Sequence, residues 1–239
     1  MDAQMKQSLF GIIGLFAVCG LLIGAFSFWL GGDESSDVRA TNETEEAVNL
    51  EEILQVDQLE EYNEEITNRM NPIAVLQTNY GVIELELFDD AMPITAGNFM
   101  KLAREGFYDG IQFHRVIDGF MIQGGDPNTK TENTLSYGTG GPGYAIPDEH
   151  IAGEKLTNVR GTISMANSGP ESGGSQFFIN LRDNTDLDFD KPDLRSKHPV
   201  FGKVVSGMDV VDTIAKVETG PTDLPLDAVV MESVTIKGE

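Results

Sequence analysis

The sequence is poor in cysteine, histidine and basic residues, and each shortage excludes a class of site. The single cysteine, Cys19, rules out an intramolecular disulfide and a cysteine-rich zinc site. The three histidines, His114, His150 and His198, lack metal-ligand spacing, so we expect no bound metal. The chain has 16 Lys and Arg against 39 Asp and Glu, which gives a formal net charge of −23. Because phosphate affinity requires clustered basic side chains, this charge argues against nucleic-acid binding.

Common catalytic motifs are also missing. Ser175 lies in GGSQF (173–177), which lacks the final glycine of a Gly-x-Ser-x-Gly nucleophile turn. The glycine-rich GTGGPG (138–143) lacks the Gly-Lys-Ser/Thr ending of a phosphate loop. The carboxylates of DNTDLDFDKPD (183–193) are typical of a solvated loop rather than of a glycosidase pair. The sequence therefore predicts no cofactor, and it offers no obvious side-chain nucleophile.

Residues 9–30, LFGIIGLFAVCGLLIGAFSFWL, form a run without charged side chains. A helix of this length, at about 1.5 Å rise per residue, reaches about 33 Å and crosses a bilayer core. Trp29 stands at the end of the run, where an interfacial aromatic residue is expected. We predict a transmembrane helix. A cleaved signal peptide is the alternative, although its apolar core usually has only about 7–15 residues.

The charges that flank this run predict its orientation. Lys6 and the N-terminal amine precede it, whereas Asp33, Glu34 and Asp37 follow it. Positive charge favours the cytoplasmic side of a membrane. We therefore expect residues 1–8 to be a cytoplasmic flank of a single-pass inner-membrane protein whose C-terminal part is periplasmic.

Residues 31–70 contain 13 acidic and 2 basic side chains, and Tyr62 is their only aromatic residue. Such a segment buries little apolar surface, so it predicts an acidic linker. Between residues 44 and 68 the acidic side chains alternate with apolar ones in a period that is partly helical. Two interpretations stay open: a solvated spacer, and a short amphipathic helix that binds a partner.

Residues 71–239 have the pattern of one mostly β domain. Ile83, Leu85 and Leu87 alternate with glutamates, as in a strand with one solvated face. Residues 92–108 predict a helix, because Pro93 suits its first turn and Phe99, Leu102 and Ala103 share a face. A second short helix is predicted after Gly207. Two strands are expected within 73–88, around a turn at 78–81, and further strands at 113–117, 121–124, 162–165, 177–180, 200–205 and 229–237. Many short strands with few helices predict a closed barrel or a sandwich.

Three sequence blocks then coincide: FHRVIDGFMIQGGDP (113–127), GTISMANSGPESGGSQFFINL (161–181) and HPVFGKVVSGMDVVDTI (198–214). Together they resemble cyclophilin-type peptidyl-prolyl cis-trans isomerases, and the resemblance extends over residues 72–237. GYAIPDEH (143–150) resembles the bacterial branch of this family. The resemblance implies an eight-stranded antiparallel β-barrel capped by two helices. It also implies isomerisation of X–Pro bonds in proline-containing polypeptides.

Arg115 suits this reaction chemically. The barrier to rotation about the amide is about 18–20 kcal/mol and arises from C–N resonance. A donor at the prolyl nitrogen weakens that resonance, and no bond has to break. Arginine is always charged and carries several donors in a planar fork, so it can donate without giving up a proton. The resemblance assigns the catalytic role to Arg115.

The resemblance also implies two sets of substrate-binding residues. One set lines an apolar site for the proline ring: Phe120, Met121, Phe178, Leu187 and His198. The other set holds the peptide backbone and the arginine: Gln123, Ala166, Asn167 and Gln176. We interpret His198 as a wall of the site and a hydrogen-bond donor, because the reaction requires no proton transfer.

One departure from the family pattern motivates a different function. Asp186 stands where many relatives have Trp or Phe, so an apolar wall is missing. The alternative is a membrane-tethered module that binds proline peptides with little turnover. A further alternative is a membrane scaffold that acts through residues 44–68. Our main prediction is an isomerase that accelerates the folding of exported proteins.

Overall fold

The computed structural model describes residues 71–151, 156–191 and 197–238. The predicted flank 1–8, transmembrane helix 9–30 and linker 31–70 lie outside these ranges. Within them, neither α-helix has the length and apolar character that crossing a membrane requires.

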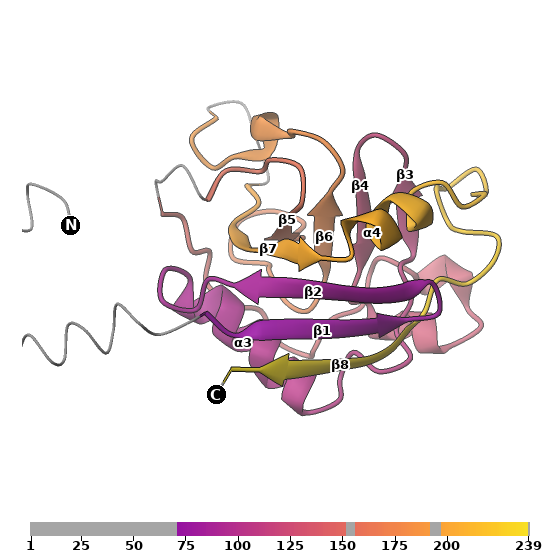
Figure 1. Cartoon of the computed structure of the whole chain (residues 1–239), viewed down its shortest axis with the longest axis horizontal. Helices are drawn as coiled ribbons and strands as arrows, with labels where there is room; N and C mark the ends of the chain where they lie inside the picture. The colour runs from indigo at the N-terminus through magenta and orange to yellow at the C-terminus, as the bar shows by residue number, and fades with distance from the viewer. Residues whose placement is uncertain (1–70, 152–155, 192–196, 239) are drawn as a thin grey trace, which may run out of the picture. The chain divides into compact units, whose positions relative to one another are not determined.

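The described domain is built on one eight-stranded sheet (Figure 1). Its strand order is β3-β4-β6-β5-β7-β2-β1-β8, and the neighbouring strands pair antiparallel. The strands are β1 (Ile73–Thr78), β2 (Gly81–Leu87), β3 (Arg115–Ile117), β4 (Met121–Gly124), β5 (Thr162–Met165), β6 (Phe177–Asn180), β7 (Val200–Ser206) and β8 (Met231–Lys237). The α-helices are α3 (Pro93–Arg104) and α4 (Met208–Ile214), and short 3-10 helices include η1 (Pro127–Lys130), η2 (Thr134–Ser136) and η4 (Thr185–Leu187). The predicted mostly β architecture with two helices is confirmed.

The alternation of residue types in β2 determines which face of the sheet is buried. Ile83, Leu85 and Leu87 are fully buried, whereas Glu84 and Glu86 remain partly exposed. Successive side chains of a strand point to opposite faces, so this pattern allows only one orientation of the strand. The prediction of a strand with one solvated face is confirmed.

The sheet forms a half-barrel whose edge strands, β3 and β8, are joined only at one end. Gln112, three residues before β3, and Val230, directly before β8, form an isolated antiparallel bridge. The backbone N–H of Phe113 donates to the carbonyl of Val229 at 2.8 Å. The strand pattern predicted a closed barrel or a sandwich, and the resemblance implied an eight-stranded barrel. In the structure a short bridged seam replaces a regular ladder, because β3 has only three residues.

Helix α3 supplies the centre of the core. The ring of Phe99 stacks on Tyr108 with centroids 4.9 Å apart, and it lies 5.5 Å from both Phe177 and Phe201. Leu102 and Ala103 are buried on the same face, as the sequence predicts. Aromatic contacts of this kind add to the free energy gained from burial. The core thereby holds β6, which carries part of the site described next.

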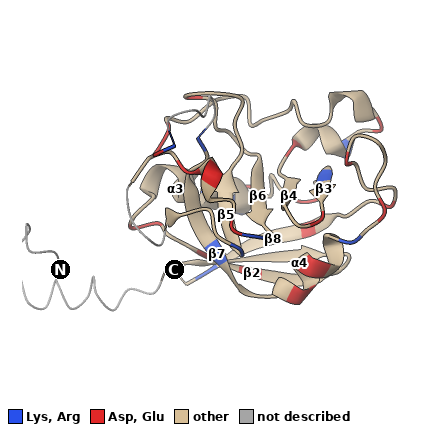
Figure 2. Cartoon of the chain, turned by 90° about the horizontal axis from the view of Figure 1, so that it is seen from above, with Lys and Arg blue, Asp and Glu red and all other residues tan. Residues whose placement is uncertain are grey.

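Most charged residues are at least partly exposed, although Asp126 and Glu149 are buried, and Figure 2 shows the basic residues distributed over several elements. Several of them pair with a carboxylate instead of forming a cluster. Arg160 Nη2 lies 2.8 Å from an oxygen of Asp212 on α4, and Arg115 Nε lies 3.4 Å from Asp223. Arg115 is therefore part of a local ion pair and not of a basic patch.

Candidate active site

The register of β3, β4 and β6 aligns three predicted site residues. Arg115 on β3 stands opposite Gln123 on β4, and Gln123 stands opposite Phe178 on β6. Opposed residues of antiparallel strands point to the same face, so these side chains share one surface. Met121 lies two residues before Gln123 and shares that face as well. The register thus puts Arg115, the Gln123 amide, the Phe178 ring and the Met121 thioether on one face of the sheet.

An apolar wall continues from this surface. The rings of Phe178 and His198 meet edge to face, with centroids 5.3 Å apart and planes at 79°. The backbone N–H of His198 donates to the carbonyl of Leu187 at 3.2 Å. His198 Nδ1 lies 3.0 Å from the carbonyl oxygen of Met165, which can only accept, so Nδ1 carries the hydrogen. The structure therefore brings Phe178, Leu187 and His198 together, with the imidazole ring fixed by the backbone.

Arg115 is held from one side only. Its Nε donates to Asp223 Oδ2 at 3.4 Å, and both side chains are 42% exposed. The loop that carries Asp223 is fixed to β3, because the N–H of Val116 donates to the carbonyl of Asp223 at 2.8 Å. Neither Nη1 nor Nη2 donates a hydrogen bond within the described part of the chain. These two nitrogen atoms are available to a ligand.

A row of amide groups lies on the other side of Arg115. Gln123 Nε2 donates to Gln176 Oε1 at 3.0 Å, and Gln176 Nε2 donates to the carbonyl of Gly140 at 2.8 Å. The N–H of Ala166 donates to the carbonyl of Gln176 at 3.0 Å. Asn167 Nδ2 donates to the carbonyl of Lys197 at 2.7 Å, next to His198. Hydrogen bonds thus connect Gln123, Gln176 and Ala166, and the bond to the carbonyl of Lys197 fixes Asn167 separately.

These four residues line a cavity of about 500 Å³. The loop 138–142 and the side chains of Tyr144, Ser168 and Ser172 complete it. Its lining is rich in amides, hydroxyls and backbone groups, which suits an extended peptide. None of the predicted proline-site residues lines this cavity, and Phe178, Leu187 and His198 form the apolar wall outside it.

Phe120 is fixed by residues that the sequence did not single out. It lies in the turn between β3 and β4, and its carbonyl accepts hydrogen bonds from the N–H of Leu181 and from Asn184 Nδ2, both at 2.9 Å. The guanidinium carbon of Arg182 lies 5.9 Å from the centre of its ring. The position of Phe120 therefore depends on the segment that follows β6.

Two buried histidines, His198 of the predicted proline site and His114 next to Arg115 in the chain, favour their neutral forms. Burial lowers the pKa of His198, although the carbonyl of Met165 and the charge of Asp148 oppose the shift. Burial also lowers the pKa of His114, with the charge of Asp126 opposing and that of Arg115 adding to the effect. The guanidinium thus has no second cation at these positions to compete for electron-rich groups of a ligand.

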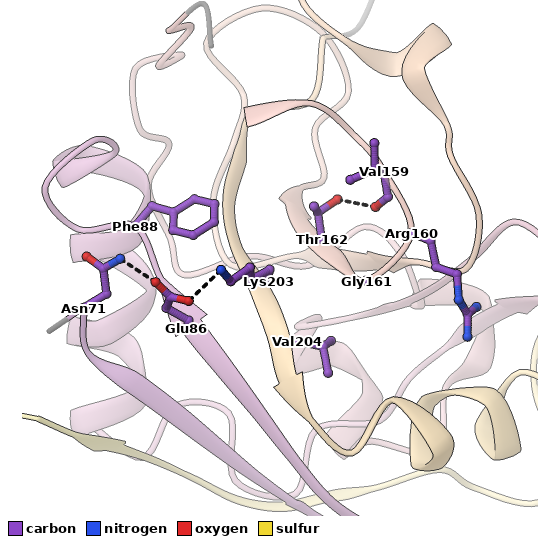
Figure 3. A pocket seen from close by; sticks show the side chains of 9 residues that line it. All are labelled: Asn71, Glu86, Phe88, Val159, Arg160, Gly161, Thr162, Lys203 and Val204. Atoms are coloured by element: carbon purple, nitrogen blue, oxygen red, sulfur yellow. Dashed lines mark hydrogen bonds and ion pairs between the residues drawn. The ribbon is translucent and has the colours of Figure 1, made fainter. Parts of the chain in front are cut away.

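A second cavity, of about 300 Å³, lies where β2 meets β7 (Figure 3). Glu86 accepts a hydrogen bond from Asn71 Nδ2 at 2.7 Å and pairs with Lys203 Nζ at 3.0 Å. The cavity is further lined by Phe88, Val159, Arg160, Gly161, Thr162 and Val204. None of these described residues belongs to the predicted site. The contacts of Glu86 with Asn71 and Lys203 join β2 to the segment before β1 and to β7.

Sequence reasoning missed two polar residues that touch the site, Asp223 and Asn184. Each contacts a predicted residue through a loop far from it in the sequence. The acidic residue Asp186, which we expected to replace an apolar wall, lies in η4 with its side chain exposed to solvent. Its neighbour Leu187 is the residue of this turn whose backbone contacts His198.

Comparison with known proteins agrees with this geometry. The model of the family "Cyclophilin type peptidyl-prolyl cis-trans isomerase/CLD" matches residues 73–236. A peptidyl-prolyl cis-trans isomerase of Arabidopsis thaliana is 45% identical over 161 residues, which cover 67% of this chain and 93% of that protein. Peptidyl-prolyl cis-trans isomerase B of Escherichia coli is 42% identical over 172 residues, covering 69% of this chain and 99% of that protein. Other curated relatives are longer, and the chain spans 40% and 27% of two of them.

A solved structure shows the same fold. The crystal structure of a cyclophilin-type peptidyl-prolyl cis-trans isomerase of Cryptosporidium parvum, determined in the presence of the dipeptide Ala-Pro, aligns with a TM-score of 0.59 and 29% identity. The alignment covers 70% of this chain and 99% of that one. The sequence blocks, the aligned strands and these relatives lead to one conclusion: the chain belongs to the cyclophilin-type peptidyl-prolyl cis-trans isomerase family.

Proposed function

We propose that the protein isomerises X–Pro bonds of exported polypeptides and that Arg115 is its catalytic residue. The observation that carries the proposal is the register that sets Arg115, Gln123 and Phe178 side by side across β3, β4 and β6. Across these strands Gln123, which lines the amide-rich cavity, lies between Arg115 and the ring of Phe178.

The reaction follows from this arrangement. A guanidinium N–H that donates to the prolyl nitrogen weakens the resonance of the amide, so the C–N bond gains single-bond character. The apolar wall formed with Phe178 and His198 holds the proline ring while the preceding carbonyl turns. Catalysis arises because these contacts are stronger in the twisted state than in either planar isomer.

The cavity that contains Gln123, Ala166, Asn167 and Gln176 suits the peptide that precedes the proline. Its amide and backbone groups offer donors and acceptors to an extended main chain. Contacts remote from the rotating bond hold the substrate in place, which is how binding energy contributes to the rate. The substrate class is therefore a proline-containing polypeptide rather than a small molecule.

We further propose that the domain works in the periplasm, tethered to the inner membrane. The support comes from the uncharged run 9–30 and from the acidic side chains that follow it. Uncatalysed prolyl isomerisation takes about 10–100 s, long enough to limit the folding of a newly exported chain. The acidic residues 31–70 would act as a spacer or as a binding segment for a partner.

A protease-coupled assay with a proline tetrapeptide and the full chain tests the activity. We expect clear turnover, and we expect Arg115→Ala to lower kcat/KM by about 100-fold, as for other lost charge-stabilising donors. Arg160→Ala is the matched control, because Arg160 is also a half-exposed, ion-paired arginine. Binding of the peptide without turnover in the unaltered protein would favour the binding module instead.

A separate experiment tests the location. Protease added to intact spheroplasts is expected to digest the domain, and protease added to intact cells is expected to leave it whole. A domain that is protected in spheroplasts would place it in the cytoplasm and remove the role in export, while leaving the isomerase activity unaffected.

A further inference from the structure

Two predicted walls of the proline site stand on different loops, and buried amide side chains hold both of them. Phe120 lies in the turn before β4, and His198 lies just before β7. Asn184 Nδ2 donates to the carbonyl of Phe120 at 2.9 Å. Asn158 Nδ2 donates to the carbonyl of His198 at 3.1 Å. Each wall is therefore fixed through its backbone by an asparagine that does not itself line the site.

A third asparagine connects these two. Asn184 Nδ2 also donates to Asn180 Oδ1 at 2.8 Å, and Asn180 Nδ2 donates to Asn158 Oδ1 at 3.3 Å. All three residues are fully buried. The result is a continuous line of hydrogen bonds from the carbonyl of Phe120, through Asn184, Asn180 and Asn158, to the carbonyl of His198.

The hydrogens of these three amides are all used. Besides the bonds above, Asn180 donates to Thr162 Oγ1 at 2.9 Å, and Asn158 donates to Asp188 Oδ1 at 2.8 Å. Asn184 donates to both of its neighbours in the line and accepts from Arg182 Nε, whereas Asn180 and Asn158 each accept from one neighbour and donate to the next. Connected bonds of this kind polarise one another. Removing one member leaves its neighbours buried and unpaired, which is costly. The loss of any one of these asparagines is therefore expected to disrupt the whole line of hydrogen bonds.

The same segment also fixes the third wall. The N–H of Leu187 donates to the carbonyl of Asn184 at 2.9 Å, and the N–H of His198 donates to the carbonyl of Leu187 at 3.2 Å. The turn η4 is thus connected to Asn184 at one end and to His198 at the other. A shift of the asparagine line would move Phe120, Leu187 and His198 relative to one another.

We propose that Asn158, Asn180 and Asn184 are positioning residues that set the width of the proline site by fixing the loops of Phe120 and His198. This inference rests on the proposed function of the site. The asparagines do not touch the substrate, and Arg115 lies outside their hydrogen bonds. Substituting the asparagines is therefore expected to change how the proline ring fits its site, and not the hydrogen bond that Arg115 donates.

The test is a double-mutant cycle on the full chain with the proline tetrapeptide. Asn184→Leu and Asn158→Leu, at the two ends of the line, are each expected to raise KM and lower kcat/KM about tenfold, within the range that small misplacements cost. The kcat/KM of the double variant is expected to lie within about twofold of that of either single variant. Once one substitution has broken the line of hydrogen bonds, the second has little further effect. Leu76→Ala, in the fully buried part of β1, is the control for a general loss of stability.

Several results would overturn the proposal. Losses that multiply to about 100-fold in the double variant would mean that the two ends act independently. The asparagine variants could also have kcat/KM values within about twofold of that of the unaltered protein, or of that of the Leu76→Ala control. Either result would mean that the asparagines only support the core. A fall in kcat at constant KM would shift the effect to Arg115 and contradict the proposal as well.

Two further measurements keep the test decisive. If the leucine variants do not fold, Asn184→Asp keeps the size of the side chain and the acceptor for Arg182 Nε, but removes both donated hydrogens. If the unaltered protein shows no turnover, the proposed function fails, and the same cycle is measured on the Kd of the dipeptide Ala-Pro. Non-additive losses of affinity would then support the positioning role, and unchanged affinity would refute it.

Discussion

Asp223 Oδ2 lies 3.4 Å from Arg115 Nε, although the two residues are 108 positions apart in the chain. Asp223 has a φ of 61°. This is the left-handed region of the backbone, which residues other than Gly, Asn and Asp seldom adopt. Its carbonyl accepts a hydrogen bond from Val116, so the loop is fixed to the strand that carries the arginine. The carboxylate thus restrains the guanidinium from the side that faces away from Gln123.

Asp223→Asn is expected to lower kcat/KM about threefold to tenfold, because a less restrained guanidinium is less often in position to donate. Asparagine tolerates the left-handed backbone, so the loop should keep its shape. The melting temperature should hardly change, since an exposed ion pair contributes only about 0–1 kcal/mol. Peptide turnover and thermal unfolding measure the two quantities. Asp227→Asn, an exposed change in the same loop region, is the control.

Arg115→Lys keeps the positive charge but replaces the planar fork by a single ammonium group. We expect kcat/KM to fall about tenfold to 100-fold, because lysine cannot contact Asp223 and still present two further donors in the same plane. The assay is the same proline-peptide assay. Activity equal to that of the unaltered protein would show that charge alone suffices and that the fork geometry is irrelevant.

The sequence predicts most of the fold because the strands are short and strongly patterned. The alternation of Ile83, Leu85 and Leu87 with glutamates predicts β2. The spacing of Phe99, Leu102 and Ala103 predicts the buried face of α3. The half-barrel seam could not be foreseen. The short strand β3 and the bridge between Gln112 and Val230 depend on where two distant segments meet, and alternation carries no information on that.

The sequence likewise predicts some residues of the candidate site and not others. The position of Arg115 within a sequence block shared with isomerases led to its assignment, and the register then places Gln123 and Phe178 beside it. Asp223 and Asn184 carry no comparable signal, because an aspartate or an asparagine in a polar loop is usually a solvated turn residue. Their role becomes visible only when the loops are folded against β3 and the turn at Phe120.

Gly125 occupies a position that admits no side chain. Its φ is +89°, and an added Cβ would lie 2.2 Å from the carbonyl oxygen of Ser175. Gly125→Ala is therefore expected to lower the free energy of unfolding by about 3 kcal/mol or more. Gly110→Ala is the matched comparison: its φ is +77°, but no atom lies within 4 Å of the added Cβ. That change should cost only about 1–2 kcal/mol, the strain of the left-handed backbone alone. Equal losses in urea unfolding would contradict this steric account.

Glu149 takes the place of the missing cap of α3. The N-cap residue Met92 has no side-chain hydrogen bond, whereas the carboxylate of Glu149 accepts from the N–H of Thr95 at 2.8 Å and of Ile94 at 3.2 Å. Glu149→Ala should lower the free energy of unfolding by about 1–2 kcal/mol, because two N–H groups at the start of the helix lose their acceptor. Glu171→Ala, at an exposed glutamate, is expected to have a smaller effect in the same denaturation experiment.

His114 makes the stability of the domain depend on pH. The side chain is 6% exposed, and an interaction with the backbone of Gln112 only partly offsets the cost of burying its charged form. Burial lowers its pKa in the folded state from the ordinary value of 6.5, with Arg115 acting in the same direction and Asp126 opposing. Between the lowered pKa and about 6.5 the unfolded chain binds more protons than the folded one. The free energy of unfolding should therefore be constant above about 6.5 and should fall as the pH decreases below that value.

The variant His114→Phe removes the titrating group while keeping a buried ring of similar size. Its free energy of unfolding should fall less steeply between about pH 6.5 and pH 5 than that of the unaltered protein. A residual slope is expected from His198, whose pKa burial also lowers. Urea unfolding at a series of pH values measures both slopes. An unchanged slope in the variant would show that His114 is charged, or already partnered, in the folded state, and the neutral surroundings of Arg115 would have to be reconsidered.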